Sequence, residues 1–140
     1  MNNLINIFNN SKNIPPIWLM RQAGRYMNEY MEIKAKFPDF FSMCKNIDAV
    51  HNITLQPIKK FDLDAGIIFS DILIVLECLN IKVKFIQGIG PIVQNFNIEK
   101  FEINNKEQFD FNKIKNVYEA ISKLKMDLKV LKKPLIGFSA

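Results

Sequence analysis

The sequence has little of the residue types that build many specialised sites. Its 140 residues include two cysteines, Cys44 and Cys78, and one histidine, His51. The cysteines are far apart and form no Cys-x-x-Cys pair, so the sequence predicts neither a disulfide framework nor a zinc site, and no bound metal. We expect both to be small buried thiols in a reducing compartment. No serine or cysteine lies within a nucleophile motif.

Long apolar runs and dense basic runs are also missing. No stretch approaches the roughly 18–20 apolar residues of a membrane span, and residues 1–13 lack the features of a signal or transit peptide. We therefore expect a cytoplasmic protein without a membrane partner. The net charge of +5 comes from scattered lysines, a pattern that favours a solvated surface over nucleic-acid binding. The lysines between 123 and 133 alternate with leucines and are expected on the outer face of an amphipathic helix.

The first half of the chain is predicted to be mainly helical. Residues 1–15 are interpreted as an N-terminal arm that Pro15 and Pro16 close. Prolines and capping residues then divide the sequence into short elements. The expected elements are a helix over 25–36 ended by Pro38, a turn over 40–45 capped by Asp39, and a helix over 46–61 that begins at Asn46 and that Pro57 should kink or divide.

The second half alternates between strand-like and helix-like patterns. Residues 63–69 form a short apolar run typical of a strand buried on both faces. Residues 72–79 fit either helix or loop. The remaining expected elements are a hairpin of 81–85 with 92–93 around the turn 88–91, a polar connection over 94–112, a helix from Asn112 to Lys133 ended by Pro134, and a buried strand over 135–138. This order predicts an α/β fold with parallel strands.

The basic residues give the sharpest internal indication of a site. Seventeen of the nineteen are lysine, and the only arginines, Arg21 and Arg25, are four residues apart. Arginine supplies a planar, bidentate fork for carboxylate or phosphate. If the segment is helical or tightly turned, both guanidinium groups can face one side, and the small Ala23 and Gly24 let a ligand approach the backbone. The alternative is two surface arginines on a loop.

Asp71 is the second candidate. It lies just beyond the carboxyl end of the predicted strand 63–69, which is the edge where parallel α/β sheets collect ligands and catalytic groups. The alternative is a helix N-cap for the segment that starts at Ile72. The remaining candidates are weaker: His51 is expected on a solvated helix face, Asp62 and Asp64 as turn or cap residues, and the cluster Phe37, Phe40 and Phe41 as core.

Several motifs in order resemble one enzyme family, the uroporphyrinogen decarboxylases. Residues 16–26, P-I-W-L-M-R-Q-A-G-R-Y, are similar to the N-terminal signature of the family. The likeness continues through residues 29–30 (E-Y), 54–61 (T-L-Q-P-I-K-K-F), 63–73 (L-D-A-G-I-I-F-S-D-I-L), 90–91 (G-P) and 134–139 (P-L-I-G-F-S). It therefore covers the chain from about Pro15 to its last residue.

The resemblance implies a fold, a reaction and a set of roles. The fold would be the N-terminal part of a (β/α)8 TIM-type barrel with preceding helices, incomplete in this chain. The enzyme would be a cofactor-independent, homodimeric lyase that removes the carboxyl groups of the four acetate side chains of uroporphyrinogen III, giving coproporphyrinogen III for haem biosynthesis. Arg21 and Arg25 would bind substrate carboxylates. Gln22, Ala23 and Gly24 would shape the same wall with backbone contacts, and Asp71 would accept the pyrrole N–H groups.

The sequence departs from the family pattern in places. Asn28, Met31, Lys34 and Leu76 stand where proline or arginine is common, which affects loop shape and secondary contacts. The larger departure is length, because such barrels need about 250 residues or more. We expect the chain to be incomplete as a folding unit and inactive when isolated. The alternatives are a non-catalytic tetrapyrrole-binding remnant and a corrinoid methyltransferase of the same superfamily, which usually lacks an intact R-Q-A-G-R.

Overall fold

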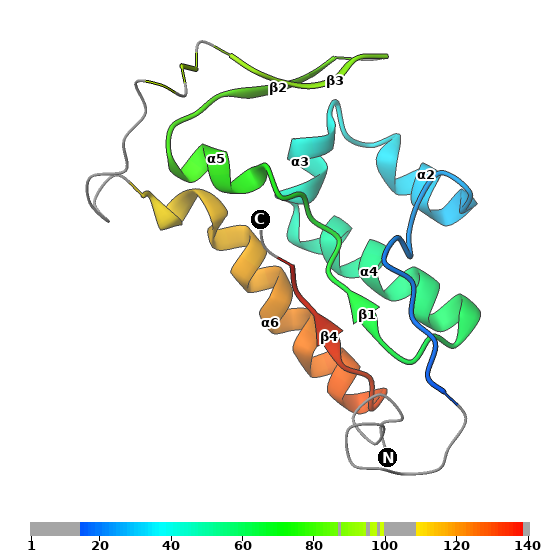
Figure 1. Cartoon of the computed structure of the whole chain (residues 1–140). Coiled ribbons are helices and arrows are strands. Elements are labelled where there is room, and N and C mark those ends of the chain that lie inside the picture. Colours follow the sequence, from blue (N-terminus) through cyan, green and yellow to red (C-terminus); the bar gives the residue numbers. More distant parts are fainter. Residues whose placement is uncertain (1–14, 87, 95, 98, 100–108, 139–140) are drawn as a thin grey trace.

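The computed structural model describes residues 15–138, except 87, 95, 98 and 100–108. Nearly all of the expected N-terminal arm, part of the polar connection and the last two residues therefore lie outside the described residues. The described chain is a mixed α/β arrangement (Figure 1). Its elements are α2 (Asn28–Lys34), α3 (Phe40–Cys44), α4 (Ile47–Phe61), β1 (Gly66–Ile67), α5 (Ile74–Cys78), β2 (Val83–Ile86), β3 (Gly90–Val93), η3 (Phe111–Ile114), α6 (Lys115–Val130) and β4 (Leu135–Ile136).

The two expected core strands pair in parallel, which confirms that part of the α/β prediction. Gly66 of β1 is in register with Leu135 of β4, and Ile67 with Ile136. Both strands are only two residues long, shorter than the predicted runs 63–69 and 135–138. Burial on both faces also proved incomplete, because both residues of β4 are only half-buried.

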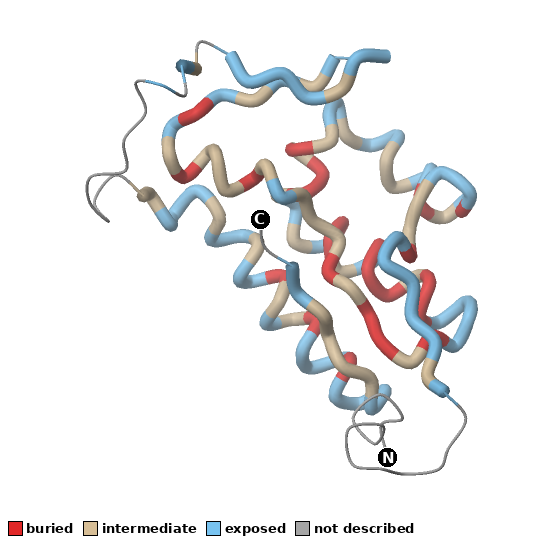
Figure 2. Tube along the Cα trace, viewed as in Figure 1, coloured by how far each residue is buried: buried red, intermediate tan, exposed pale blue. Residues whose placement is uncertain are grey.

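The core lies where β1 packs between α4 and α6. Figure 2 shows its buried residues in red along β1 and along the facing sides of the two helices. From α6 the buried side chains are Ala120, Leu124 and Leu128, spaced four residues apart so that they share one helix face. The lysines of α6 lie off this face, as predicted. The backbone of Gly66 approaches α4 so closely that a Cβ there would lie 2.4 Å from Cδ1 of Ile58.

The predicted helix caps are confirmed in α3 and α4. The Asp39 carboxylate accepts a hydrogen bond from the Ser42 amide at 2.8 Å, and Asn46 Oδ1 accepts one from the Ala49 amide at 2.9 Å. Pro57, however, does not divide α4, which runs unbroken from Ile47 to Phe61. Pro57 and neighbouring side chains on α4 are buried, so tertiary packing holds the helix together across the missing backbone donor.

Other boundaries differ from the sequence prediction. The helix expected from residue 25 begins only at Asn28, and the long C-terminal helix starts as the 3₁₀ turn η3 before α6. Residues 72–79, for which two interpretations were open, contain α5. The hairpin is confirmed, with Val83 paired to Val93, although Gly90 and Pro91 belong to β3 and not to the turn. No helix in the described ranges is long and apolar enough to cross a membrane.

His51 was predicted on a solvated helix face, and the structure corrects this. Its side chain is only 11% exposed, and its Nε2 lies 2.6 Å from Oδ2 of Asp127 on α6. A second pair, Lys123 with Asp48, joins the same two helices at 2.7 Å. The histidine was misplaced because the sequence showed the helix face but not which helix would pack against it.

Candidate functional site

The two arginines lie in an irregular loop, not in a helix. Residues 21–25 precede α2, and the turn closes where the Met27 amide donates to the Gly24 carbonyl at 3.0 Å. The side chains of Arg21 and Arg25 are exposed. Among the described residues neither guanidinium makes an ion pair, whereas five lysines do. The arginines are therefore available for an external anion.

Gln22, between Arg21 and the small residues, has a buried side chain. Only 2% of the residue is exposed. Its Nε2 donates to the Ala65 carbonyl at 2.7 Å, and its Oε1 accepts from the Ile67 amide at 3.0 Å. Both polar atoms of the side chain are therefore hydrogen-bonded along β1, and the backbone amide of Gln22 remains for a ligand. Nothing in the sequence pattern indicated this contact.

Ala23 and Gly24 have different surroundings. Ala23 packs against the buried cluster that contains Met27 and Tyr30. A Cβ placed on Gly24 would meet only the Tyr26 ring at 3.6 Å, which is ordinary contact. Tyr26 in turn donates its hydroxyl to the Gln22 carbonyl. Nothing among the described residues therefore requires glycine at position 24. Close approach of a ligand to the backbone stays a prediction for this position.

Asp71 follows β1 through Phe69 and Ser70. Its Oδ1 accepts from the Leu73 amide at 2.8 Å, so the carboxylate begins the turn that leads into α5. The N-cap interpretation is wrong, because α5 begins at Ile74 with Leu73 at the cap position and no side-chain cap bond. The role of Asp71 in a site stays a prediction. One oxygen starts the turn, and no described residue is a hydrogen-bond partner of the other.

The segment before Asp71 is fixed from two sides. The Phe69 amide donates to Oγ1 of the buried Thr54 on α4 at 3.0 Å. The Phe69 ring makes edge contacts with Tyr30 and Phe40, at centroid distances of 5.9 and 5.7 Å. The predicted core role of the phenylalanine cluster is confirmed, since Phe41 is buried and Phe37 and Phe40 pack against the core.

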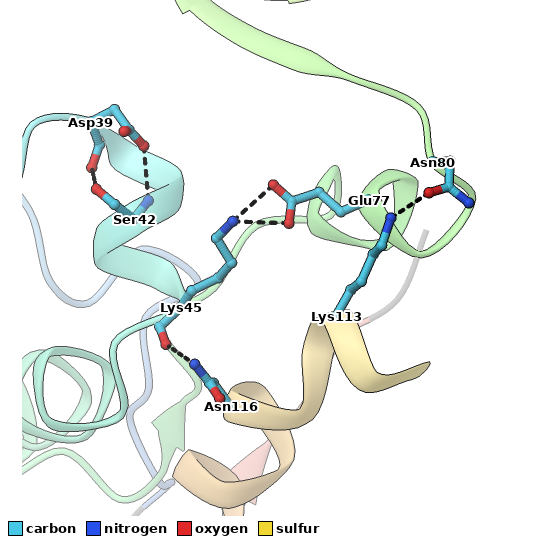
Figure 3. A network of polar contacts seen from close by, with 7 residues as sticks. All are labelled: Asp39, Ser42, Lys45, Glu77, Asn80, Lys113 and Asn116. Carbon is cyan, nitrogen blue, oxygen red and sulfur yellow. Dashed lines mark hydrogen bonds and ion pairs between the residues drawn. The ribbon is translucent and has the colours of Figure 1, made fainter. Parts of the chain in front are cut away.

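The segment after Asp71 is fixed through α5, in the polar network of Figure 3. Lys45, which ends α3, reaches both carboxylate oxygens of Glu77 on α5 at 3.0 Å. Its own carbonyl accepts from Nδ2 of Asn116 on α6 at 2.9 Å. A third contact joins Lys113 of η3 to Asn80, just after α5. Asp71 is thus held between anchored elements on either side.

Electrostatic effects connect Arg25 and Asp71 through a buried pair of side chains. Burial raises the pKa of Tyr30, the nearby Cys44 thiol raises it further, and the Arg25 guanidinium opposes both. Burial also raises the pKa of Cys44 well above its usual range, and the carboxylates of Asp71 and Asp39 add to that shift. Arg25 thus acts on the pKa of the buried Tyr30, and Asp71 on that of the buried Cys44.

Two hollows in the described surface lie away from these residues. One of about 490 Å³ lies between α6 and β4, with Lys125 and Leu135 among its lining, and one of about 310 Å³ lies between α2 and α4. Neither contains the arginines or Asp71. No group of three or more potential metal ligands occurs among the described residues. The candidate residues are thus two exposed arginines that hold no ion pair with described residues, and an aspartate whose carboxylate accepts from the Leu73 amide.

Comparison with known proteins gives consistent matches. The family model for uroporphyrinogen decarboxylase (URO-D) matches residues 3–140. The uroporphyrinogen decarboxylase of Francisella tularensis subsp. novicida is 40% identical over 132 residues, which cover 89% of this chain and 36% of that protein. The enzyme of the same name from Rickettsia bellii is 41% identical over 133 residues, 91% of this chain and 37% of that protein. The chain thus spans little more than a third of these relatives.

Proposed function

Because the chain belongs to the uroporphyrinogen decarboxylase family, we propose that it supplies the arginine-bearing wall and the central carboxylate of a uroporphyrinogen decarboxylase site. The whole enzyme would be a (β/α)8 barrel, a cytoplasmic homodimer without a cofactor, and would convert uroporphyrinogen III to coproporphyrinogen III. The parallel pairing of β1 with β4 across α6 supports the barrel. The carrying observation is that Arg21 and Arg25 are exposed and unpaired among the described residues, beside the strand that leads to Asp71.

Arg21 and Arg25 would bind the carboxylates of the substrate. Uroporphyrinogen carries eight of them, and each charge-assisted hydrogen bond contributes roughly 1.5–3 kcal/mol. An arginine that already holds an ion pair would have to break it first. Arg21 and Arg25 hold none with described residues, so their forks can bind the substrate at no such cost.

Asp71 would stabilise positive charge on the substrate during the reaction. Protonation of a pyrrole carbon makes that ring cationic, and the ring then takes up the electron pair released when the carbon–carbon bond to the leaving carboxylate breaks. The exocyclic methylene left by CO₂ is then protonated to a methyl group, and the ring carbon releases the first proton, so that one proton in total replaces CO₂. A fixed carboxylate that accepts the pyrrole N–H groups stabilises the cation. The unshared oxygen of Asp71 is the acceptor that this role requires.

The 140-residue chain itself is expected to bind without turning over. It spans little more than a third of its relatives, and its arginines face solvent instead of an opposing wall. A tetrapyrrole-binding remnant is therefore the second candidate function. The intact R-Q-A-G-R motif argues against a corrinoid methyltransferase. Robust coproporphyrinogen production by the purified chain would contradict the expected inactivity.

The decisive experiment tests Asp71 within a complete enzyme. Residues 1–140 would replace the matching segment of the Francisella relative, and coproporphyrinogen formation would be measured with and without Asp71→Asn. We expect turnover to fall on the order of 10² to 10³ times. Asp62→Asn is the matched control, because Asp62 is 95% exposed at the end of α4, where asparagine tolerates its positive φ. Unchanged turnover in Asp71→Asn would show that the Asp71 carboxylate does not stabilise the cationic substrate.

A further inference from the structure

The two edges of β1 are bonded in different ways. The amides of Gly66 and Ile68 point to β4 and donate to the Pro134 and Ile136 carbonyls, both at 3.0 Å. Alternate residues of a strand direct their backbone groups to opposite edges. Ala65, Ile67 and Phe69 therefore face the outer edge, away from β4.

At this outer edge, side chains take the place of a neighbouring strand. The Gln22 amide group donates to the Ala65 carbonyl and accepts from the Ile67 amide, as the peptide group of an adjacent parallel strand would do. Thr54 then accepts from the Phe69 amide. The segment before Gln22 runs beside β1 in Figure 1, and the Asp64 amide donates to the Ile17 carbonyl at 2.9 Å.

From this arrangement we propose that Gln22 is a positioning residue: its side-chain amide fixes the register of the arginine loop against β1, the strand that leads to Asp71. The inference rests on the proposed function, because it concerns the same carboxylate-binding surface. Gln22 lies next to Arg21 in sequence and is buried, whereas Arg21 is exposed. Holding its side chain therefore holds the backbone from which the exposed Arg21 side chain extends.

The need for such a device follows from the loop itself. Residues 21–25 form no regular element, so the ladder bonds of a helix or strand do not set their position. A slip of one residue along β1 would move the loop about 3.3 Å. Recognition of carboxylate by a guanidinium fork tolerates only about 0.5 Å. The two hydrogen bonds from Gln22 to Ala65 and Ile67, on either side of Gly66, prevent such a slip.

The test measures binding of uroporphyrin, the air-stable oxidised form of the substrate, by the 140-residue chain. Trp18 is the only tryptophan and lies three residues before Arg21, so quenching of its fluorescence reports on the loop. Gln22→Met keeps the size of the side chain and removes both hydrogen bonds. We expect it to weaken binding roughly tenfold or more. Gln56→Met is the matched control, since Oε1 of Gln56 has no hydrogen-bond partner among the described residues.

Gln22→Glu separates positioning from simple filling of space. Its carboxylate can accept from Ile67 but cannot donate to Ala65, whereas the protonated carboxyl can do both. Binding by this variant, normalised to the wild type at each pH, should therefore recover as the pH falls from about 8 to about 5.5, since burial raises the pKa of a carboxyl group. Gln22→Met should show no recovery. Equal weakness of both variants at every pH would overturn the hydrogen-bond assignment.

Amide exchange makes the inference independent of porphyrin binding. In Gln22→Met the Ile67 amide and those of residues 21–25 should exchange faster than in the wild type, while Ile53 in α4 should not. Unchanged exchange at Ile67, or wild-type porphyrin affinity in Gln22→Met, would overturn the positioning role. Arg21→Met with Arg25→Met tests the proposed function alone. If the chain still binds uroporphyrin after that change, the proposed role of the two arginines is wrong. The exchange result then still decides the role of Gln22.

Discussion

Gly24 and Gly66 show how differently two glycines of this chain are used. Gly66 lies in β1, where a Cβ would come within 2.4 Å of Cδ1 of the buried Ile58, and within 3.6 Å of Leu128. Gly24 lies in the arginine loop, where a Cβ would make only ordinary contacts. Packing thus accounts for one glycine, and the proposed ligand accounts for the other.

Paired alanine substitutions separate these two uses. Gly66→Ala is expected to destabilise the fold by about 1–3 kcal/mol, because Ile58 must move within a close-packed core. Gly24→Ala is expected to leave stability within about 0.5 kcal/mol and to weaken uroporphyrin binding instead. Urea unfolding followed by circular dichroism, together with Trp18 quenching, measures both effects. Equal destabilisation by the two changes would contradict the distinction.

The site could be identified from the sequence only at the level of residue types. The isolation of Arg21 and Arg25 among seventeen lysines was visible in the sequence. The direction of the Gln22 side chain was not, because it depends on Ala65 and Ile67, more than forty residues away. A polar residue within a motif suggests ligand contact, and only tertiary structure shows that its side chain is already bonded.

At the level of elements, α4 is the helix that its neighbours contact through ion pairs and apolar packing. Lys60 pairs with Glu29 of α2 at 2.7 Å, and Lys133 with Asp62 at the end of α4 at 2.6 Å. Towards α6 its polar contacts are His51 with Asp127 and Asp48 with Lys123, beside a shared apolar core that includes Leu55 and Leu124. The apolar contacts supply most of the stability, and the pairs set the relative position of the helices.

A double-mutant cycle tests the contact between α4 and α6. His51→Ala and Asp127→Ala are expected to show a coupling of about 0.5–1 kcal/mol, since the histidine is largely buried while Asp127 is half-exposed. Urea midpoints of the wild type, both single variants and the double variant give the value. Lys129→Ala, an exposed change on the same helix, should couple to neither. Additive effects of His51→Ala and Asp127→Ala would show that the pair contributes nothing.

Capping residues in the sequence predicted where helices begin. The sequence predicted less well how far helices and strands extend. Asp39 and Asn46 cap their helices as expected, because a cap depends on the next three residues alone. Pro57 was expected to kink or divide α4 and does not divide it, since burial of its helix face outweighs one lost hydrogen bond. The strands are shorter than their apolar runs because strand length depends on partners, and β1 has a partner strand on one edge only in the described part of the chain.

For the molecule as a whole, the charged pairs predict how stability changes with pH. Hydrogen bonds from Lys60, Lys123 and Lys133 lower the pKa values of Glu29, Asp48 and Asp62 below their ordinary values. A group with a lowered folded-state pKa stabilises the fold above its unfolded pKa, and this contribution is lost as the pH falls through the folded value. The stabilisation from these three exposed pairs should therefore be lost over the same range in acid, below about pH 4, as the carboxylates become protonated.

We expect the urea midpoint to fall as the pH is lowered from neutral into this range. The double variant Asp48→Asn with Asp62→Asn should show a shallower fall, because two of the titrating carboxylates are gone. Circular dichroism at several pH values measures the slope, and added salt should flatten the wild-type curve as well. Parallel curves for the variant and the wild type would show that these pairs do not govern acid stability.

The closed outer edge of β1 also bears on how the chain avoids associating with other chains. An exposed strand edge is a template for intermolecular strand addition, a common first step of aggregation. Gln22 and Thr54 satisfy β1 without offering such a template. Among the described residues, β4 has no strand on its far side. In the described part of the chain, the edge open to a further strand is therefore that of β4, where the next strand of the proposed barrel would add.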